Sequence, residues 1–152
     1  MQTVTTIELS AAFVTAILAI APTMEALRSV KWAYVPSPRA GTRAALPQGT
    51  RNFDLLFRDA RPTREWKGGI GTAYKVSLAV AVSYSGVEPA TRQHLKAQDA
   101  VDIYRALARL RDPTVAGFVN IEPTGEANEI TDEANAYVEH SFTISYHQAT
   151  AA

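Results

Sequence analysis

Apolar and polar residues alternate most regularly between Tyr74 and Tyr84, where even-numbered positions are apolar and the positions between them are small or polar. Successive side chains of a strand point to opposite faces of a sheet, so this period predicts a long strand. Shorter runs with the same period predict strands over 30–34 and 53–57. Two further strands are expected over about 115–122 and 135–148.

Two segments have the spacing of helices. Thr5 and Glu8 are placed as a capping box before an apolar run, which predicts a helix over about 5–21. A short second helical piece is expected over 24–28. Farther along, apolar residues recur at helical spacing between charged ones, which predicts an amphipathic helix over 95–110.

The apolar run over 11–21 has the length of the hydrophobic part of a secretory signal peptide. A signal peptide carries positive charge before this run, but here the first basic residue is Arg28, and Glu8 precedes the run. The run is also shorter than the ~20 residues that span a bilayer. The sequence therefore predicts a buried helix and no membrane contact.

In chain order these segments predict the succession α-β-β-β-α-β-β. Long strands with hairpin-like links favour an α+β fold, in which a mainly antiparallel sheet of about five strands carries both helices on one face. The 152 residues suit a single domain over 1–152, because no repeat or linker divides them. Residues 36–50 and 59–72 show no sustained period and are expected to form extended loops or arms.

Composition narrows the function classes. Hydrophobic residues at 47% and charged residues at 20% are typical of a globular protein rather than a disordered or fibrous one. The chain has no cysteine, which excludes a disulfide framework, thiolate metal sites and a cysteine nucleophile. Its stability must therefore come from its core.

Charge is distributed unevenly, although the net charge is zero. The segment 28–75 holds ten of the fifteen basic residues and three acidic ones, whereas from Asp112 onward there are seven acidic residues and no Lys or Arg. Such opposite charges either pair within one fold, which is the simpler interpretation, or join identical subunits head to tail. The candidate residues for a subunit or partner interface are Arg39, Arg43, Arg51, Arg58, Arg61, Arg64, Lys67, Glu126, Glu129, Asp132 and Glu133.

The basic candidates lie with Phe53 and Trp66 in a loop-rich region, a pattern that can grip phosphates. Dedicated DNA-binding domains are usually basic, whereas this chain has a pI of about 6.8. The region therefore favours protein contact, or passing contact with DNA, over dedicated DNA binding.

No catalytic or cofactor motif stands out. Gly68, Gly69 and Gly71 precede a predicted strand rather than a helix, so they indicate a flexible turn instead of a phosphate loop. The acidic residues from Glu122 to Glu133 lack the calcium-loop pattern and are expected to form a solvated loop. We expect no cofactor and no metal site.

The histidines offer no clear metal site either. His140 and His147 are seven residues apart on the last predicted strand and point to opposite faces, so this pair cannot share a metal ion. His140 lies on the apolar face and is expected to be a structural histidine with its hydrogen bonds satisfied. An enzyme site built from His140, Tyr137 and Glu139 is the least favoured alternative, because adjacent strand residues point to opposite faces.

The chain resembles the tail terminator proteins of long-tailed phages. The resemblance rests on the N-terminal helix, the long arm between the first strands, the long alternating strand, the helix QDAVDIYRALARLRDP and the final strand AYVEHSFTISYHQ. It covers most of the chain and depends on the order and size of the elements rather than on an invariant motif.

The resemblance implies a structural virion protein and no catalysis. Copies would form a hexameric ring that caps the tail tube, ends its polymerisation and joins tail to head. Its partners would be the tail tube protein, a head-completion or neck protein and, in passing, DNA in the lumen. It would be assembled in the host cytoplasm and reside at the tail-head joint of the virion. Another neck or head-tail connector protein and a small nucleic-acid-binding module stay open as alternatives.

Overall fold

The computed structural model describes residues 3–21, 31–34, 50–65, 71–84, 89–132 and 135–149. Within these residues the chain forms two helices and one five-stranded sheet, so the fold is α+β as the sequence predicts. The elements, in the predicted order, are α1 (Thr6–Leu18), β1 (Lys31–Tyr34), β2 (Thr50–Glu65), β3 (Gly71–Ser83), α2 (Pro89–Ala108), β4 (Phe118–Asp132) and β5 (Asn135–Ala149).

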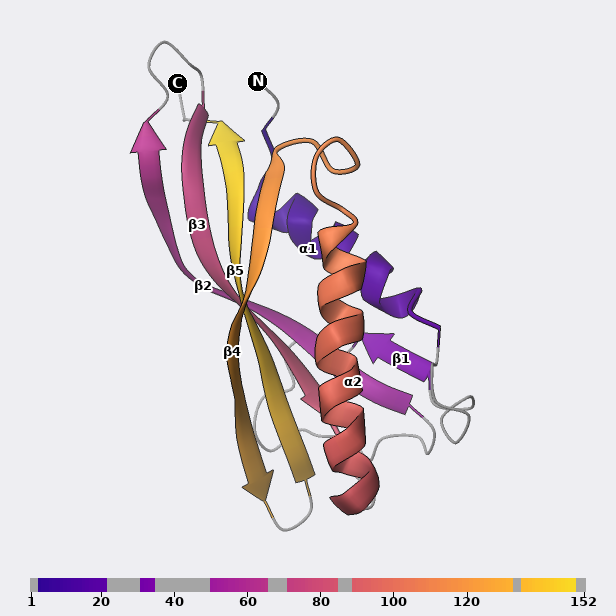
Figure 1. The fold of residues 1–152 in the computed structure, drawn as a ribbon. Coiled ribbons are helices and arrows are strands. Elements are labelled where there is room, and N and C mark those ends of the chain that lie inside the picture. Colours follow the sequence, from indigo (N-terminus) through magenta and orange to yellow (C-terminus); the bar gives the residue numbers. More distant parts are fainter. Residues whose placement is uncertain are drawn as a thin grey trace.

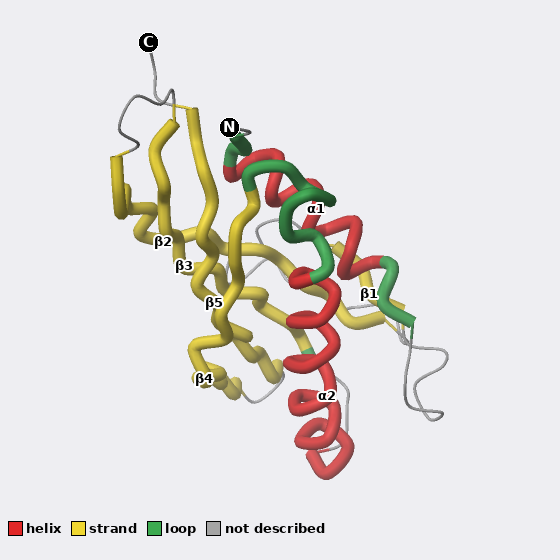
Figure 2. The backbone as a smooth tube through the Cα atoms, turned by 45° about the horizontal axis from the view of Figure 1, so that its top comes forward, coloured by secondary structure: helices red, strands yellow, loops and turns green. Residues whose placement is uncertain are grey.

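The strands lie in the order β1-β2-β3-β5-β4. β1 is parallel to β2, and every other neighbouring pair is antiparallel. The β2–β3 and β4–β5 hairpins extend toward opposite ends of the sheet (Figure 1). Both helices lie on the same side of the sheet and contact each other (Figure 2).

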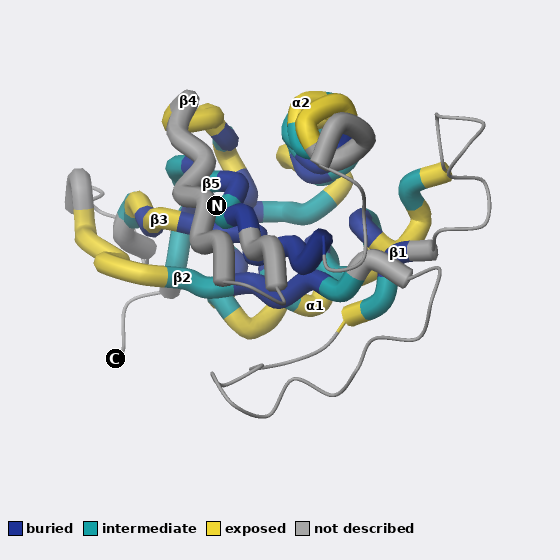
Figure 3. Tube along the Cα trace, turned by 90° about the horizontal axis from the view of Figure 1, so that it is seen from below, coloured by how far each residue is buried: buried dark blue, intermediate teal, exposed yellow. Residues whose placement is uncertain are grey.

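The core lies between the helices and the sheet, where the buried residues gather (Figure 3). The apolar face of β3 is buried, as its period predicts. Phe13 of α1 contacts strands near both edges of the sheet. The centre of its ring lies 6.3 Å from that of Phe57 on β2 and 5.2 Å from that of Phe118 on β4. Aromatic rings at these separations add to the stabilisation that burial provides.

The capping box predicted the start of α1 correctly. Thr5 is the N-cap residue, and its hydroxyl accepts a hydrogen bond from the Glu8 amide at 3.2 Å. α1 ends at Leu18, slightly before the expected limit. Residues 24–28 and 36–49, for which a helical piece and a loop were expected, lie outside the described residues.

The connection expected over 59–72 is wrong for residues 59–65, which continue β2 to Glu65, and for residues 71–72, which begin β3. Residues 66–70 lie outside the described residues. The pairing of β2 with β3 shifts register between Arg58 and Arg61 and again between Pro62 and Arg64, and Asp59 has a φ of 57°. These β-bulges break the alternation of side chains while the chain stays in the sheet. The period therefore disappears from the sequence although the strand does not end.

The acidic loop is also corrected. β4 runs to Asp132, so Glu122, Glu126 and Glu129 belong to a strand. The register of β4 with β5 shifts between Pro123 and Ala127, and among the described residues β4 pairs with a strand on one side only. A bulged edge strand with polar residues lacks the alternation by which strands are recognised.

Gly117 sits where the chain enters β4 and has a φ of 91°. A Cβ atom at this position would lie 2.8 Å from the carbonyl carbon of Thr3 and 2.9 Å from the amide nitrogen of Val4. Backbone hydrogen bonds hold this close approach: Val4 N–H donates to the His147 carbonyl, and His147 N–H donates to the Gly117 carbonyl. Glycine is therefore required both for its conformation and for space.

We expect Gly117→Ala to lower the free energy of unfolding by about 2 kcal/mol or more, because the left-handed backbone is strained and the N-terminal segment must move. Chemical denaturation measures this change. Thr114→Ala, in the same turn and exposed, is the matched control and should stay within about 0.5 kcal/mol of the parent. Equal stability of the two variants would contradict the close approach.

Candidate interaction surface

Three polar side chains from different elements meet in the core. The Tyr84 hydroxyl, just after β3, donates to Asp99 Oδ2 on α2 at 2.8 Å and lies 3.0 Å from Nε2 of His140 on β5. Because the single phenolic proton goes to the carboxylate, the phenolic oxygen accepts from His140 Nε2–H, which assigns the tautomer of that ring. The three residues are 0%, 1% and 3% exposed, in the order Tyr84, Asp99 and His140.

This buried network is structural in its geometry. It ties α2 to β5 and to the residue that follows β3, and all three side chains are buried. The expectation that His140 is a satisfied structural histidine is confirmed. Its partners Tyr84 and Asp99 were missed, although one signal was present: Asp99 falls between Leu95 and Ile103 in the apolar stripe of α2.

Burial, and then the charge of Lys96, lowers the pKa of His140 from 6.5 to about 4. The ring is therefore neutral at pH 7, which agrees with a single N–H donated to Tyr84. Glu139, the neighbour of His140, takes part in an ion pair with Arg58 instead. The side chains of Glu139 and His140 therefore do not converge, as the alternation along a strand predicts.

The candidate interface residues separate into three groups. Arg58 and Arg61 are exposed on β2. The backbones of five others belong to two strands: β2 contains Arg51 and Arg64, and β4 contains Glu126, Glu129 and Asp132. The remaining candidates lie outside the described residues: Arg39, Arg43, Lys67 and Glu133.

The structure brings opposite charges to opposite sides of the sheet. The β2–β3 hairpin, over residues 58–75, has five basic and two acidic residues. The β4–β5 hairpin, over residues 122–139, has six acidic residues and no basic one. The strand pairs β2–β3 and β4–β5 extend toward opposite ends of the sheet (Figure 1), which separates the described charges near those ends.

One ion pair does join the two charged segments. Arg58 Nη2 lies 3.3 Å from Glu139 Oε1, and the two side chains are 55% and 13% exposed. Since β3 lies between their strands, the pair spans β3 on the face away from the helices. Pairing within the fold therefore holds for this pair, whose exposed arginine limits its contribution to about 1 kcal/mol or less.

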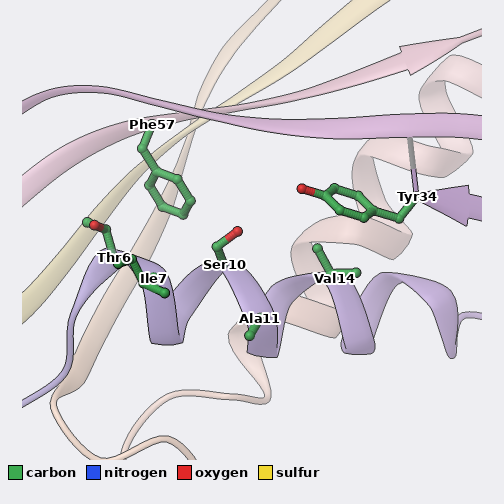
Figure 4. Close-up of a pocket in the computed structure, with 7 residues that line it drawn as sticks. All are labelled: Thr6, Ile7, Ser10, Ala11, Val14, Tyr34 and Phe57. Atoms are coloured by element: carbon green, nitrogen blue, oxygen red, sulfur yellow. The ribbon is translucent and has the colours of Figure 1, made fainter. Parts of the chain in front are cut away.

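An apolar groove of about 600 Å³ runs between α1 and β2 (Figure 4). In Figure 4 the Phe57 ring points from the strand toward α1, and the Tyr34 ring lies over the same helix. Ile7 is 81% exposed on the helix side. The groove is lined by Thr6, Ile7, Ser10, Ala11, Val14, Tyr34 and Phe57.

α1 is apolar on its outer side as well as on its inner side. Leu9, Phe13 and Ile17 are buried, while Ile7 and Leu18 are exposed. Exposed apolar residues beside an apolar groove are typical of a surface that another molecule covers. This groove is therefore a candidate contact surface that sequence patterning did not reveal.

Tyr34 closes one end of the groove with a neutral hydroxyl. Burial, the charge of Asp54 and a hydrogen bond with Asp54 together raise the pKa of Tyr34 above 10.0. The described residues include no group of three or more His, Asp or Glu side chains placed to hold a metal ion. Neither described helix is long and apolar enough to cross a membrane.

The fold and surface thus define a mixed α+β domain with charged sheet edges and an apolar groove. No model of a known protein family matches the chain, and a search of curated proteins finds no match either.

We expect Tyr84→Phe to lower the free energy of unfolding by about 1–3 kcal/mol, because Asp99 and His140 each lose a hydrogen-bond partner in the core. Tyr74→Phe removes a hydroxyl outside this network and is the matched control. Denaturant titration compares the two variants. An equal cost for both would mean that the network does not stabilise the fold.

Stability should also fall on acidification because of His140. The unfolded chain binds a proton at this ring near pH 6.5, whereas the folded chain does so only near pH 4. Unfolding is therefore favoured by up to about 3 kcal/mol as the pH falls across this interval, with no further change below it. In His140→Gln the loss of stability between pH 7 and pH 4 should be smaller by this amount. His147→Gln, outside the network, is the control, and an unchanged pH profile in His140→Gln would refute the assignment.

Proposed function

We propose that this chain is a structural virion protein of the tail terminator type, which forms a ring that caps the tail tube, ends its polymerisation and joins tail to head. The observation that carries the proposal is the placement of opposite charges on opposite sides of one sheet. Two complementary surfaces that face away from each other favour a head-to-tail contact between identical copies. Such a contact closes into a ring when the rotation per copy allows it.

The two hairpins supply distinct surfaces for distinct partners. In a ring whose axis follows the strands, the β2–β3 tips lie on one side and the β4–β5 tips on the other, as their opposite directions in Figure 1 require. One side would contact the tail tube protein and the other a head-completion or neck protein. The central hole would pass DNA without a dedicated binding site.

Protein contact is favoured over a phosphate-binding surface for a specific reason. The arginines of β2 are interspersed with Asp54, Asp59 and Glu65, and Arg58 already contacts Glu139. Interspersed carboxylates weaken the attraction for a phosphate backbone. They suit a contact with another protein that carries both signs of charge.

The test is electron microscopy and native mass spectrometry of the purified protein at increasing concentration, alone and with the tail tube protein of the same phage. We expect closed rings with a central hole, binding at tube ends, and shorter tubes when the protein is present during polymerisation. Tubes polymerised without it set the reference length. A protein that does not bind tube ends and leaves tube length unchanged would overturn the proposed function.

A further inference from the structure

We propose that neighbouring copies join edge to edge, so that the open part of β2 in one copy receives β4 of the next and a single sheet continues through the assembly. The contact deepens the proposed function and rests on it for closure into a ring. The occupant of the apolar groove is therefore a second copy of this chain.

The first observation is a step at one edge of the sheet. β1 pairs with β2 only from Thr50 to Phe53, whereas β2 continues to Glu65. Beyond Phe53, no strand among the described residues pairs with the outer edge of β2, and none pairs with the outer edge of β4. Open edges present backbone N–H and C=O groups on which another strand can pair.

The second observation is that opposite charges lie at the two ends of the same row of paired residues. One row of paired residues crosses the sheet, with a cation at one end and an anion at the other: Arg58, Ser77, Thr143 and Glu122. Both charged residues are exposed. β2 and β4 run in opposite directions, so two copies placed side by side in the same orientation pair antiparallel. This arrangement sets Glu122 of one copy against Arg58 of the next.

Arg61 strengthens the same contact. Its row leads across the sheet to Asn120, whose side chain donates to Glu122 Oε1 at 3.3 Å. Glu122 is thereby held between the rows of Arg58 and Arg61. Because Arg58 is already paired with Glu139, Arg61 is the cleaner position for a test.

Two prolines limit the contact to a short window. Pro123 shares a row with Phe57, and Pro62 shares a row with Phe118. Proline has no N–H to donate, so backbone pairing is confined to residues 57–62 of one copy and 118–123 of the next. A contact of this length is weak singly and gains strength when a ring closes.

The groove lies on the helix side of this window. Phe57, which begins the window on β2, also lines the groove beside the exposed Ile7. On the β4 edge the exposed Pro123 shares the row of Phe57, so the next copy places this apolar residue beside the Phe57 end of the groove. A second copy at this edge thus adds apolar contact on one face of the sheet to charge complementarity on the other.

The test uses two charge reversals, Arg61→Glu and Glu122→Arg, in the otherwise intact chain. Each alone places like charges at every contact and should raise the concentration for half-maximal assembly by about tenfold or more. An equimolar mixture of the two variants should restore assembly, because alternating copies again set opposite charges together. A chain with both reversals should also assemble. Sedimentation velocity measures all four cases.

Arg109→Glu, an equal charge reversal at an exposed residue just after α2 and outside both paired strands, is the matched control and should assemble like the parent. Circular dichroism verifies that each variant is folded. Single variants that assemble normally, or that stay impaired in the mixture, overturn the edge contact, as does a parent chain that never self-associates. If rings cap tubes and the charge reversals do not affect assembly, the proposed function is supported and the edge contact is rejected. If mixing the two variants restores assembly but the assemblies do not bind tube ends, the edge contact is supported and the proposed function is rejected.

Discussion

An open sheet has two edges whose backbone groups need partners, and this constraint governs what the chain presents to other molecules. β1 covers only the first four residues of β2, and the outer edge of β4 has no neighbour among the described strands. Bulges and prolines interrupt both edges, so only a short stretch of each is suited to pairing. The two stretches lie on the same rows of the sheet and differ in charge, so each edge complements the other rather than itself.

Packing in the core fixes the positions of these edges. Phe13 packs α1 against β2 and β4, which lie near opposite edges of the sheet. The Tyr84 hydroxyl links α2 to β5 through Asp99 and His140. Because these buried polar groups are hydrogen-bonded to one another, they fix α2 against the sheet at little cost in unsatisfied polar groups. The helices in turn leave one side of α1 exposed beside the open part of β2. Packing inside the domain thus determines where its contact surface lies.

The sequence predicted the elements whose period is unbroken. The alternation over 74–84 and the helical spacing over 95–110 correspond to β3 and α2, and the helix cap at Thr5 was placed correctly. It failed where bulges break the period, in the second half of β2 and the distal part of β4. The rows that join Arg58 to Glu122 depend on strand order and register, which no local pattern encodes. The groove could not be predicted because its lining residues come from α1, β1 and β2, and no local pattern encodes how these elements are placed relative to one another.

The measurement that tests the central claim most directly is disulfide cross-linking of a chain with Arg61→Cys and Asn120→Cys together, since the parent has no cysteine. Within one chain these positions lie on β2 and β4, with β3 and β5 between them, so they are about 14 Å apart, beyond the reach of a disulfide. Mild oxidation should yield a ladder of covalent oligomers that ends at the ring, whereas each single cysteine variant stops at dimers. A double variant that assembles like the parent but stays monomeric after oxidation and denaturation would contradict the edge-to-edge contact.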